Sequence, residues 1–352
     1  MFLLLALQLV RPLGGVVALI QPVAVLSGRD AGGVRARALE AACLPMLWIA
    51  EQPVFDADVE VCAPVLVRGR EAAATALVRG RGFRPGPTAP APAPSAASWS
   101  PLLAALQDLP VRSLLTDGVV GDLAEATADF RDQYYGLAGA VVDRVDGSAD
   151  RPRLVTSGLI DPARLRWGER PCRFNKEAYL HPRVELGRLA VPLQEWATRR
   201  LVPKVLVATQ TRVLEAVVDA AGDLLPSVPV VTVTPRRGRA EDLWRIGALL
   251  CAPPATLVAA QRHLGSARNA TALRLSASDV LALPLPRGRA AWGWAAAAFA
   301  EASVAPDEET RGERLRASAR AMAEAYGLID DEDLLAWWAA RLPQARAGES
   351  GP

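Results

Sequence analysis

The segment FLLLALQLVRPLGGVVALIQP, residues 2–22, decides the fold class. An apolar helix-like run, Phe2–Val10, leads through Gly14 and Gly15 into a short β-branched run at Val16–Pro22. A glycine turn in this place is typical of a doubly wound α/β sheet at the point where the chain enters a buried strand. Such a strand needs neighbours on both edges and helices on both faces, so we expect an α/β sheet that this chain supplies only in part.

The bulk composition indicates a globular protein without a cysteine-based site. With 352 residues, 51% of them hydrophobic, the chain has room for two domains with cores of their own. Its four cysteines are far apart in the sequence, and its two histidines have no suitably spaced partners, which argues against a metal site. We expect reduced thiols, as in a reducing cytosol.

The start of the chain resembles a signal peptide only in its hydrophobicity. It has no basic region before the apolar run and no small-residue cleavage site after it. No later stretch reaches the roughly 18 apolar residues of a membrane-spanning helix. The sequence therefore predicts a cytoplasmic protein.

Charge is distributed unevenly along the chain. Residues 151–300 carry 22 basic and 11 acidic side chains, whereas residues 101–150 and 301–352 are net acidic. Such a basic block is expected of a surface that meets phosphates, so the sequence predicts double-stranded DNA as a partner. The alternative is a general arginine bias, because 38 of the 40 basic residues are arginine. That bias explains the choice of arginine but not the scarcity of acids in one block.

Four regions are expected: 1–79, 80–101, 102–300 and 301–352. In the first, a strand at 16–21 precedes a helix from Val34 to Ala42 that Ser27 or Asp30 caps. Two β-type runs, at 44–50 and 59–67, predict an antiparallel hairpin on the edge of the sheet. The second region is a linker rich in Pro, Ala, Gly and Ser.

Mixed secondary structure is expected in 102–300 and helix in the tail. The periodicity predicts strands at 153–157, 203–208 and 228–233, and helices at 102–109, 121–134, 241–250 and 255–263. It predicts a helical tail over 308–342. Four residues form the apolar face of this tail and two tryptophans pack it down: Leu315, Ala319, Met322, Tyr326, Trp337 and Trp338.

Several short words, in this order and spacing, resemble N6-adenine DNA methyltransferases of restriction-modification systems. Leu9–Pro22, the helix after Ser27 and VFDADVEVCAPVLV (54–67) resemble the end of their catalytic domain. The later words resemble their target-recognition domain: FRDQYYGLAGAV (130–141), TSGLIDP (156–162), VPKVLVATQT (202–211), LWRIGALLCAP (243–253) and LALPLP (281–286). The resemblance implies an incomplete Rossmann-like methyltransferase sheet (1–79) and a mixed α/β target-recognition domain (102–300). The linker (80–101) and the helical tail (301–352) have no counterpart in it.

The resemblance implies S-adenosylmethionine as the methyl donor and adenine in DNA as the acceptor. Members of this family hold the donor on a glycine-rich loop and activate the adenine amino group with an (Asn/Asp/Ser)-Pro-Pro-aromatic motif. This sequence has neither: in Ala252-Pro253-Pro254-Ala255 the prolines lack the polar and aromatic neighbours and predict a helix boundary. We expect no catalytic and no cofactor-binding residue here, and a chain that is inactive unless another polypeptide or upstream segment supplies these motifs.

The resemblance also implies a role for Phe55. In the family an aromatic side chain on the corresponding hairpin loop stacks on the flipped-out adenine, and Phe55 stands at that place. An exposed aromatic ring is suited to stacking on an unpaired base. The alternative is a core phenylalanine that closes the hairpin against the sheet.

Lys204 and Gln210 stand at the two ends of the strand predicted most firmly. Lys204, one of two lysines in the chain, is a candidate contact to a phosphate, and a strand-end lysine facing water is the alternative. Gln210 is a candidate for bidentate recognition of adenine in the major groove. Its neighbours Thr209 and Thr211 also suit an ordinary turn, which is the other interpretation.

Two arginine clusters complete the predicted DNA-binding residues. Arg236, Arg237 and Arg239 form the loop PRRGR after the second strand. Arg166 and Arg173 belong to a basic patch around Trp167. Both clusters suit the DNA backbone, and a solvated basic loop is the alternative for each.

Three hypotheses follow for the whole chain. It is the recognition half of a DNA methyltransferase, a stand-alone non-catalytic DNA-binding specificity protein, or a scaffold for another acidic partner. The all-apolar start of the first helix favours the first hypothesis, because a self-contained fold would place a polar first helix in solvent.

Overall fold

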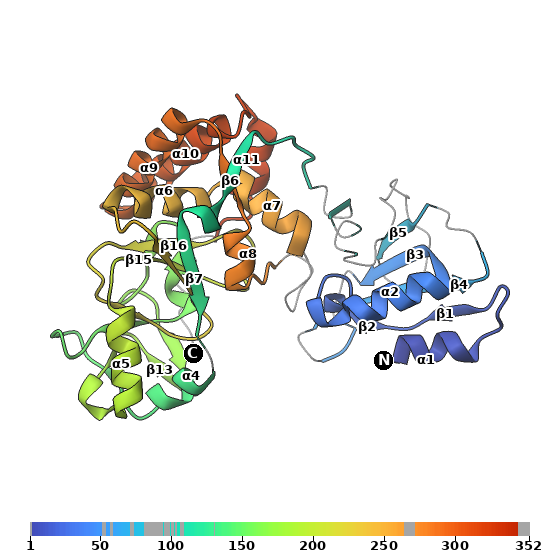
Figure 1. Cartoon of the computed structure of the whole chain (residues 1–352), viewed down its shortest axis with the longest axis horizontal. Helices are drawn as coiled ribbons and strands as arrows, with labels where there is room; N and C mark the ends of the chain where they lie inside the picture. The colour runs from blue at the N-terminus through green and yellow to red at the C-terminus, as the bar shows by residue number, and fades with distance from the viewer. Residues whose placement is uncertain are drawn as a thin grey trace. The chain divides into compact units, whose positions relative to one another are not determined.

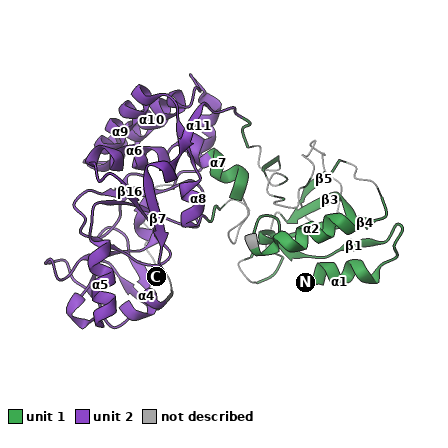
Figure 2. Ribbon diagram, viewed as in Figure 1, with its two compact units in different colours: residues 1–111, 257–274 green, residues 112–256, 275–352 purple. Residues whose placement is uncertain are grey.

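The computed structural model describes residues 2–50, 54–56, 59–70, 74–80, 94, 99, 102, 104–105, 109–129, 131–263 and 272–343 (Figure 1). It divides into two compact units: unit 1 holds 1–111 and 257–274, and unit 2 holds 112–256 and 275–352 (Figure 2). The linker predicted at 80–101 and the helix predicted at 102–109 lie largely outside the described residues.

Unit 1 contains one five-stranded sheet. Its strand order is β1-β4-β3-β5, with β2 also paired to β4; the strands are β1 (Val16–Ala18), β2 (Gln21–Pro22), β3 (Ala42–Ala50), β4 (Val61–Arg68) and β5 (Ala76–Gly80). The predicted antiparallel pairing of β3 with β4 is confirmed, with Leu47 opposite Pro64. Its predicted place at the sheet edge is wrong. β4 also pairs with β1, and β3 pairs in parallel with β5, and neither of these pairings is visible in local periodicity.

Two helices cover this sheet, α1 (Phe2–Leu9) and α2 (Gly32–Ala41). The expected caps of α2 are wrong: its N-cap is Ala31, without a side-chain hydrogen bond. The preceding turn is held by Arg35 instead, which is 1% exposed and donates from Nη1 to the carbonyls of Val25 and Gly28, both at 2.9 Å. Burial lowers the pKa of Arg35, and the two carbonyls compensate the loss of water around its charge.

The predicted linker contacts the core of unit 1 near its C-terminal end. Trp99 is fully buried, and its backbone N–H donates to the carbonyl of Leu26 at 2.6 Å. Leu102 is also fully buried. The end of the Pro/Ala-rich segment is therefore anchored in the first core.

Unit 2 is built on two four-stranded sheets. The first has the order β16-β15-β18-β7, with β7 (Ala124–Ala128), β15 (Lys204–Val207), β16 (Ala216–Asp219) and β18 (Val231–Pro235). The second has the order β17-β9-β14-β8, with β8 (Val141–Asp143), β9 (Arg153–Val155), β14 (Pro182–Val184) and β17 (Leu224–Pro226). The strands predicted at 153–157, 203–208 and 228–233 are therefore confirmed as β9, β15 and β18.

Two-stranded ladders and short turns complete the β-structure of unit 2. The ladders are β6 (Thr116–Val119) with β19 (Pro284–Pro286), β10 (Ile160–Asp161) with β11 (Arg164–Leu165), and β12 (Cys172–Phe174) with β13 (Glu177–Tyr179). The predicted helix at 121–134 is wrong over most of its length, because 124–128 is strand β7 and α4 begins only at Arg131. The sequence AEATA favours helix locally, but it pairs with β18 from Ala128↔Val231 to Ala124↔Pro235.

Three helices of unit 2 stack in succession on its first sheet (Figure 1). Helix α6 (Ala240–Leu250) packs on the β16-β15-β18 face, α9 (Arg289–Ser303) packs on α6, and α10 (Glu308–Ala325) packs on α9. The α-helices after α2 whose bounds the structure describes are α4 (Arg131–Leu137), α5 (Val191–Arg200), α6 (Ala240–Leu250), α7 (Pro253–His263), α8 (Ala277–Leu281), α9 (Arg289–Ser303), α10 (Glu308–Ala325) and α11 (Glu332–Ala339). The predicted helices at 241–250 and 255–263 are confirmed as α6 and α7.

The helical tail is confirmed and belongs to the core of unit 2. Its predicted apolar face is buried over Leu315, Ala319, Met322 and Tyr326, and Trp338 is 1% exposed. The Tyr326 hydroxyl donates to the carbonyl of Pro284 at 2.5 Å, and burial raises the pKa of that phenol.

Among the described residues, no single helix has the length and hydropathy needed to cross a membrane; the pair α6 and α7, bent by 58°, passes that test together on length and composition alone.

Candidate nucleic-acid interface

The predicted contact residues that follow β15 and β18 lie at opposite ends of the first sheet of unit 2. β15 and β18 are antiparallel, with Val205 opposite Val233 and Val207 opposite Val231. The segment after β15, which carries Gln210, therefore leaves from the opposite end of the sheet to the PRRGR loop after β18. The five residues of β18 alone span about 14 Å. The structure does not bring these two predicted sites together.

Lys204 is a structural residue, and its predicted phosphate contact is wrong. Its side chain is fully buried and its ammonium forms an ion pair with Asp219 at 2.5 Å. Asp219 also accepts the backbone N–H groups of Gly222 and Leu224 at 2.8 and 3.0 Å. Burial lowers the pKa of Lys204, while Asp219 acts to raise it. This pair fixes the turn from β16 to β17 and presents no charge to the surface.

The PRRGR loop offers one free cation. Arg236 donates to Glu125 at 2.7 Å and to the carbonyl of Gly121 at 3.2 Å. Arg239 pairs with Asp242, and this hydrogen bond raises its pKa. Arg237 is exposed and has no ion-pair partner among the described residues. Only Arg237 of the three is therefore ready for a phosphate without breaking a contact.

Most of the predicted basic patch around Trp167 is neutralised. Arg166 pairs with Asp161 at 2.7 Å, with Glu169 at 3.2 Å and with Glu308 at 2.7 Å. Burial acts to lower the pKa of Arg166, but the hydrogen bonds that Arg166 donates to Asp161 and Glu308 outweigh burial and raise it. The predicted DNA contact of Arg166 is therefore wrong, because these carboxylates hold its guanidinium inside unit 2.

The indole of Trp167 is likewise committed to the protein. Its Nε1–H donates to the carbonyl of Pro182 at 2.9 Å, and the guanidinium of Arg183 lies 4.8 Å from the ring centroid. Trp167 is thus a packing residue between β14 and its neighbours.

Arg173 is the member of this patch that remains available. In β12 the side chains of Cys172 and Phe174 are buried and that of Arg173 is exposed. It has no ion-pair partner among the described residues and lines a surface pocket of about 400 Å³. Pro229 lines the same pocket and accepts a hydrogen bond from the Thr209 hydroxyl at 3.4 Å. Arg173 therefore lies at the end of the sheet from which Gln210 departs.

Gln210 sits in a turn with its side chain exposed. Its φ of +68° is the left-handed conformation of a sharp turn. Thr211 donates from its hydroxyl to the carbonyl of Val213 within this turn. The turn interpretation therefore holds for the threonines, and Gln210 itself remains a candidate for contact with a base edge.

Phe55 lies on the connection between β3 and β4 in unit 1. Its side chain is 53% exposed, and its neighbour Val54 is 44% exposed. Phe55 therefore does not close the hairpin against a core, and the alternative stated for it is wrong. A solvent-facing ring on a loop suits stacking, which stays a prediction.

Two buried carboxylates near the pocket were missed by sequence reasoning. Asp161 is 3% exposed and takes hydrogen bonds from Arg166 and Arg170. Glu215 is 9% exposed, and burial, together with the charge of Asp161, raises its pKa to about 8. The TSGLIDP word held a signal for the first, because an aspartate after two apolar residues needs a partner if it is buried.

Comparisons with known proteins give a fold and no family. No protein-family model matches the sequence, and no curated protein matches it. Among solved structures, the chain is similar to the Type IIL restriction-modification enzyme MmeI, solved in complex with DNA, with a TM-score of 0.54 and 9% identity over 93% of this chain and 49% of that one. It also aligns with the type IIG restriction endonuclease BpuSI, with a TM-score of 0.35 and 11% identity over 97% of this chain and 49% of that one. The chain shares a fold with part of MmeI and spans about half its length.

The buried Lys204–Asp219 pair predicts a large stability effect. Lys204→Met leaves the Asp219 carboxylate buried without its cation, so we expect the free energy of unfolding to fall by about 3–5 kcal/mol. Urea denaturation measures it. The matched control is Lys176→Met, which removes the other lysine, exposed in the turn between β12 and β13. Equal stability of the two variants would contradict a structural role for Lys204.

Glu215 predicts a pH dependence of stability. The unfolded state loses the Glu215 proton near its ordinary pKa of 4.5, whereas the folded state keeps it up to about 8. The contribution of protonated Glu215 to the free energy of unfolding is therefore complete below about pH 4.5, and it is lost as the pH rises towards 8. Glu215→Gln should become more stable relative to the parent chain, by an amount on the order of a few kcal/mol, between about pH 5 and pH 8. Urea unfolding at several pH values tests it, with the exposed Glu195→Gln as control; parallel curves for all three proteins would refute it.

We expect substitutions in the PRRGR loop to weaken DNA binding and to reduce its dependence on salt. Replacing Arg236 and Arg237 by alanine should lower the slope of log K against log [salt] by about one, since Arg237 is the free cation. Arg237→Ala alone should give most of this effect, because Arg236 already pairs with Glu125. Fluorescence anisotropy with a labelled duplex at several salt concentrations measures the slope. An unchanged slope and affinity would remove this loop from the interface.

Proposed function

We propose that this chain is the DNA-recognising half of an S-adenosylmethionine-dependent adenine-N6 DNA methyltransferase of a restriction-modification system. The observation that carries the proposal is the fold shared with MmeI over 93% of this chain, since MmeI was solved in complex with DNA. In this proposal unit 2 contacts double-stranded DNA, and Phe55 of unit 1 stacks on the flipped adenine.

The charges of unit 2 support the DNA-binding part. The basic block 151–300 keeps at least two exposed cations that the described residues do not pair, Arg173 and Arg237. Gln210 adds an exposed amide at the pocket end of the sheet. These groups supply backbone charge and one candidate for base recognition.

Unit 1 supports a sheet completed by a second segment. α1 buries Leu3 and Leu7, but exposes Phe2 by 78% and Leu9 by 79%. Among the described residues, β1 pairs only with β4, so its outer edge is open beside this apolar helix. Open strand edges with apolar side chains next to them favour association with further strands and helices. We propose that this segment carries the cofactor and catalytic motifs.

S-adenosylmethionine does not fit the residues present. The turn between β2 and α2 contains Gly28, but Arg35 fills it and a Cβ at Gly28 would lie 2.7 Å from the carbonyl oxygen of Ala24. The Pro253-Pro254 pair begins helix α7 and has no polar side chain before it or aromatic after it. We therefore assign this chain no step of methyl transfer. We place the protein in the cytoplasm, where the donor and DNA both occur.

The alternative is a stand-alone DNA-binding specificity protein. It differs from the main proposal in unit 1, where a self-contained fold would not expose apolar residues along α1. The exposed Phe2 and Leu9 favour the methyltransferase half.

The purified chain should bind duplex DNA but leave it unmethylated. Incubation with labelled S-adenosylmethionine and mixed-sequence duplex DNA should transfer no methyl group above background, because the donor-binding and activating motifs are missing. Anisotropy should show salt-dependent DNA binding in the same sample. Methyl incorporation would overturn the assignment of inactivity, and a chain that binds no duplex DNA at low salt would overturn the recognition role.

A further inference from the structure

The pocket beside β12 has polar and apolar walls from segments far apart in the sequence. Thr156, Ser157 and Gly158 form one wall, and Arg173 stands on β12. The apolar lining is supplied by Pro171, Phe174, Val228 and Pro229. Its volume of about 400 Å³ lies in the range of pockets that bind small ligands.

Internal hydrogen bonds hold the 156–159 wall in place. Arg170 donates to the carbonyl of Gly158 at 2.9 Å and to the Asp161 carboxylate at 2.9 and 3.0 Å. Leu159 donates from its backbone N–H to the carbonyl of Thr156 at 3.0 Å. The wall is therefore formed before any ligand arrives, which reduces the entropy that binding costs.

One polar group in this wall has no partner. The hydroxyl of Ser157 is buried and makes no hydrogen bond within the described structure. Leaving such a group unsatisfied costs roughly 1–3 kcal/mol. A Cβ added at Gly158 would meet nothing within 4 Å, so the pocket is open beside that glycine. Ser157 also lines the pocket, so a ligand oxygen that reaches this hydroxyl would satisfy it.

The charges of the pocket favour an anion. Its lining contains two arginines, Arg170 and Arg173, and neither aspartate nor glutamate. Asp161 holds Arg170 in place, whereas Arg173 has no carboxylate partner among the described residues and can pair with a ligand. A guanidinium and a hydroxyl together match the oxygens of a phosphate, and the prolines and Phe174 suit the sugar next to it.

We propose that Arg173 and Ser157 form a binding site for one phosphodiester of the DNA backbone. The site rests on the proposed function and extends it, because it sets the register of the duplex on unit 2. Thr209 bonds to Pro229 at the pocket rim, so a phosphate held here brings the adjacent groove to the turn of Gln210. Arg173 and Ser157 position the backbone, and Gln210 faces the base edges.

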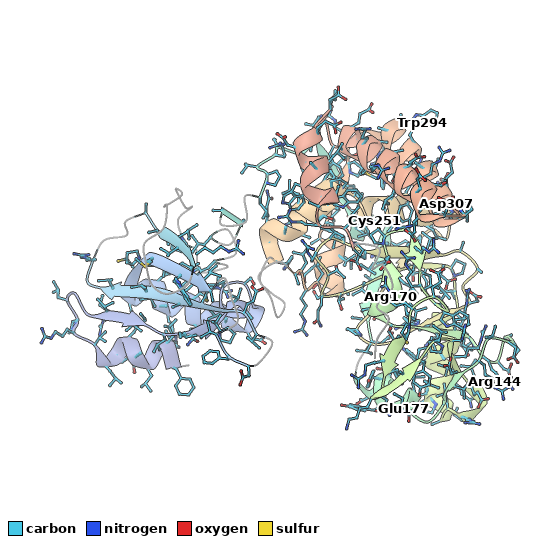
Figure 3. All side chains as sticks on the ribbon, turned by 180° about the vertical axis from the view of Figure 1, so that it is seen from behind. Arg144, Arg170, Glu177, Cys251, Trp294 and Asp307 are labelled. Atoms are coloured by element: carbon cyan, nitrogen blue, oxygen red, sulfur yellow. The ribbon has the colours of Figure 1, made fainter. Side chains whose placement is uncertain are left out.

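Three variants test the site by salt-dependent binding to duplex DNA. Arg173→Gln should lower the slope of log K against log [salt] by about 0.9, which is about a fivefold loss of affinity near 0.15 M salt. Arg144→Gln is the matched control, an exposed arginine on a loop outside the pocket and labelled in Figure 3, and should leave the slope unchanged. Ser157→Ala should weaken binding severalfold while leaving the urea midpoint unchanged or higher, because it deletes an unsatisfied hydroxyl.

Three further ligands identify the source of the phosphate. A duplex whose backbone is neutralised with methylphosphonates should bind equally to the parent chain and Arg173→Gln. Inorganic phosphate and a deoxynucleoside monophosphate should bind too weakly for calorimetry to separate these two proteins. Loss of mononucleotide binding in Arg173→Gln with an unchanged DNA slope would overturn the DNA assignment.

The possible failures are distinguishable. A parent chain that binds DNA, with Arg173→Gln and Arg144→Gln giving the same slope, removes this site and leaves the proposed function intact. A parent chain that binds no DNA removes both. Ser157→Ala with lower stability and unchanged binding would make Ser157 a structural residue and overturn its part in the site.

Discussion

The buried carboxylate of Asp161 is the group on which the arrangement of unit 2 depends. A carboxylate that is 3% exposed needs cations around it, and Arg166 and Arg170 supply them. Arg166 also forms an ion pair with Glu308 at the start of α10, and this ion pair connects the helical tail to the strands. Arg170 also donates a hydrogen bond to the carbonyl of Gly158, which fixes one wall of the pocket beside β12. One charge thus organises both the tail and the candidate phosphate site.

The same arrangement explains why net charge is a poor guide to the interface. The basic block of residues 151–300 suggests a broad positive surface, but many of its arginines pair with nearby acids. Arg166 and Arg239 are held by carboxylates, and Lys204 is fully buried on Asp219. Of the predicted contact residues, Arg173 and Arg237 are exposed and have no ion-pair partner among the described residues. A duplex that meets both would run along the strands, with Gln210 near one end.

Unit 1 is organised by a different constraint, the pairing of β4 on both of its edges. β4 joins β1 to β3 and so makes these two strands parallel, with α2 as the crossover between them. This strand order has two consequences for the surface of unit 1. Phe55 is carried into solvent at one turn, and the outer edge of β1 has no partner strand within the described part of unit 1.

The sequence by itself determined the elements whose pattern is strong and local. The β-branched runs of β15 and β18, the apolar periodicity of α6 and the buried face of Leu315 and Met322 were all predictable. Tertiary structure decided the rest. Ala124–Ala128 is strand because β18 offers it an edge, and Lys204 is buried because Asp219 lies across the ladder on β16. The pairing of Arg166 with Glu308 and the freedom of Arg173 were likewise unpredictable, because both depend on where folding places carboxylates that are distant in the sequence.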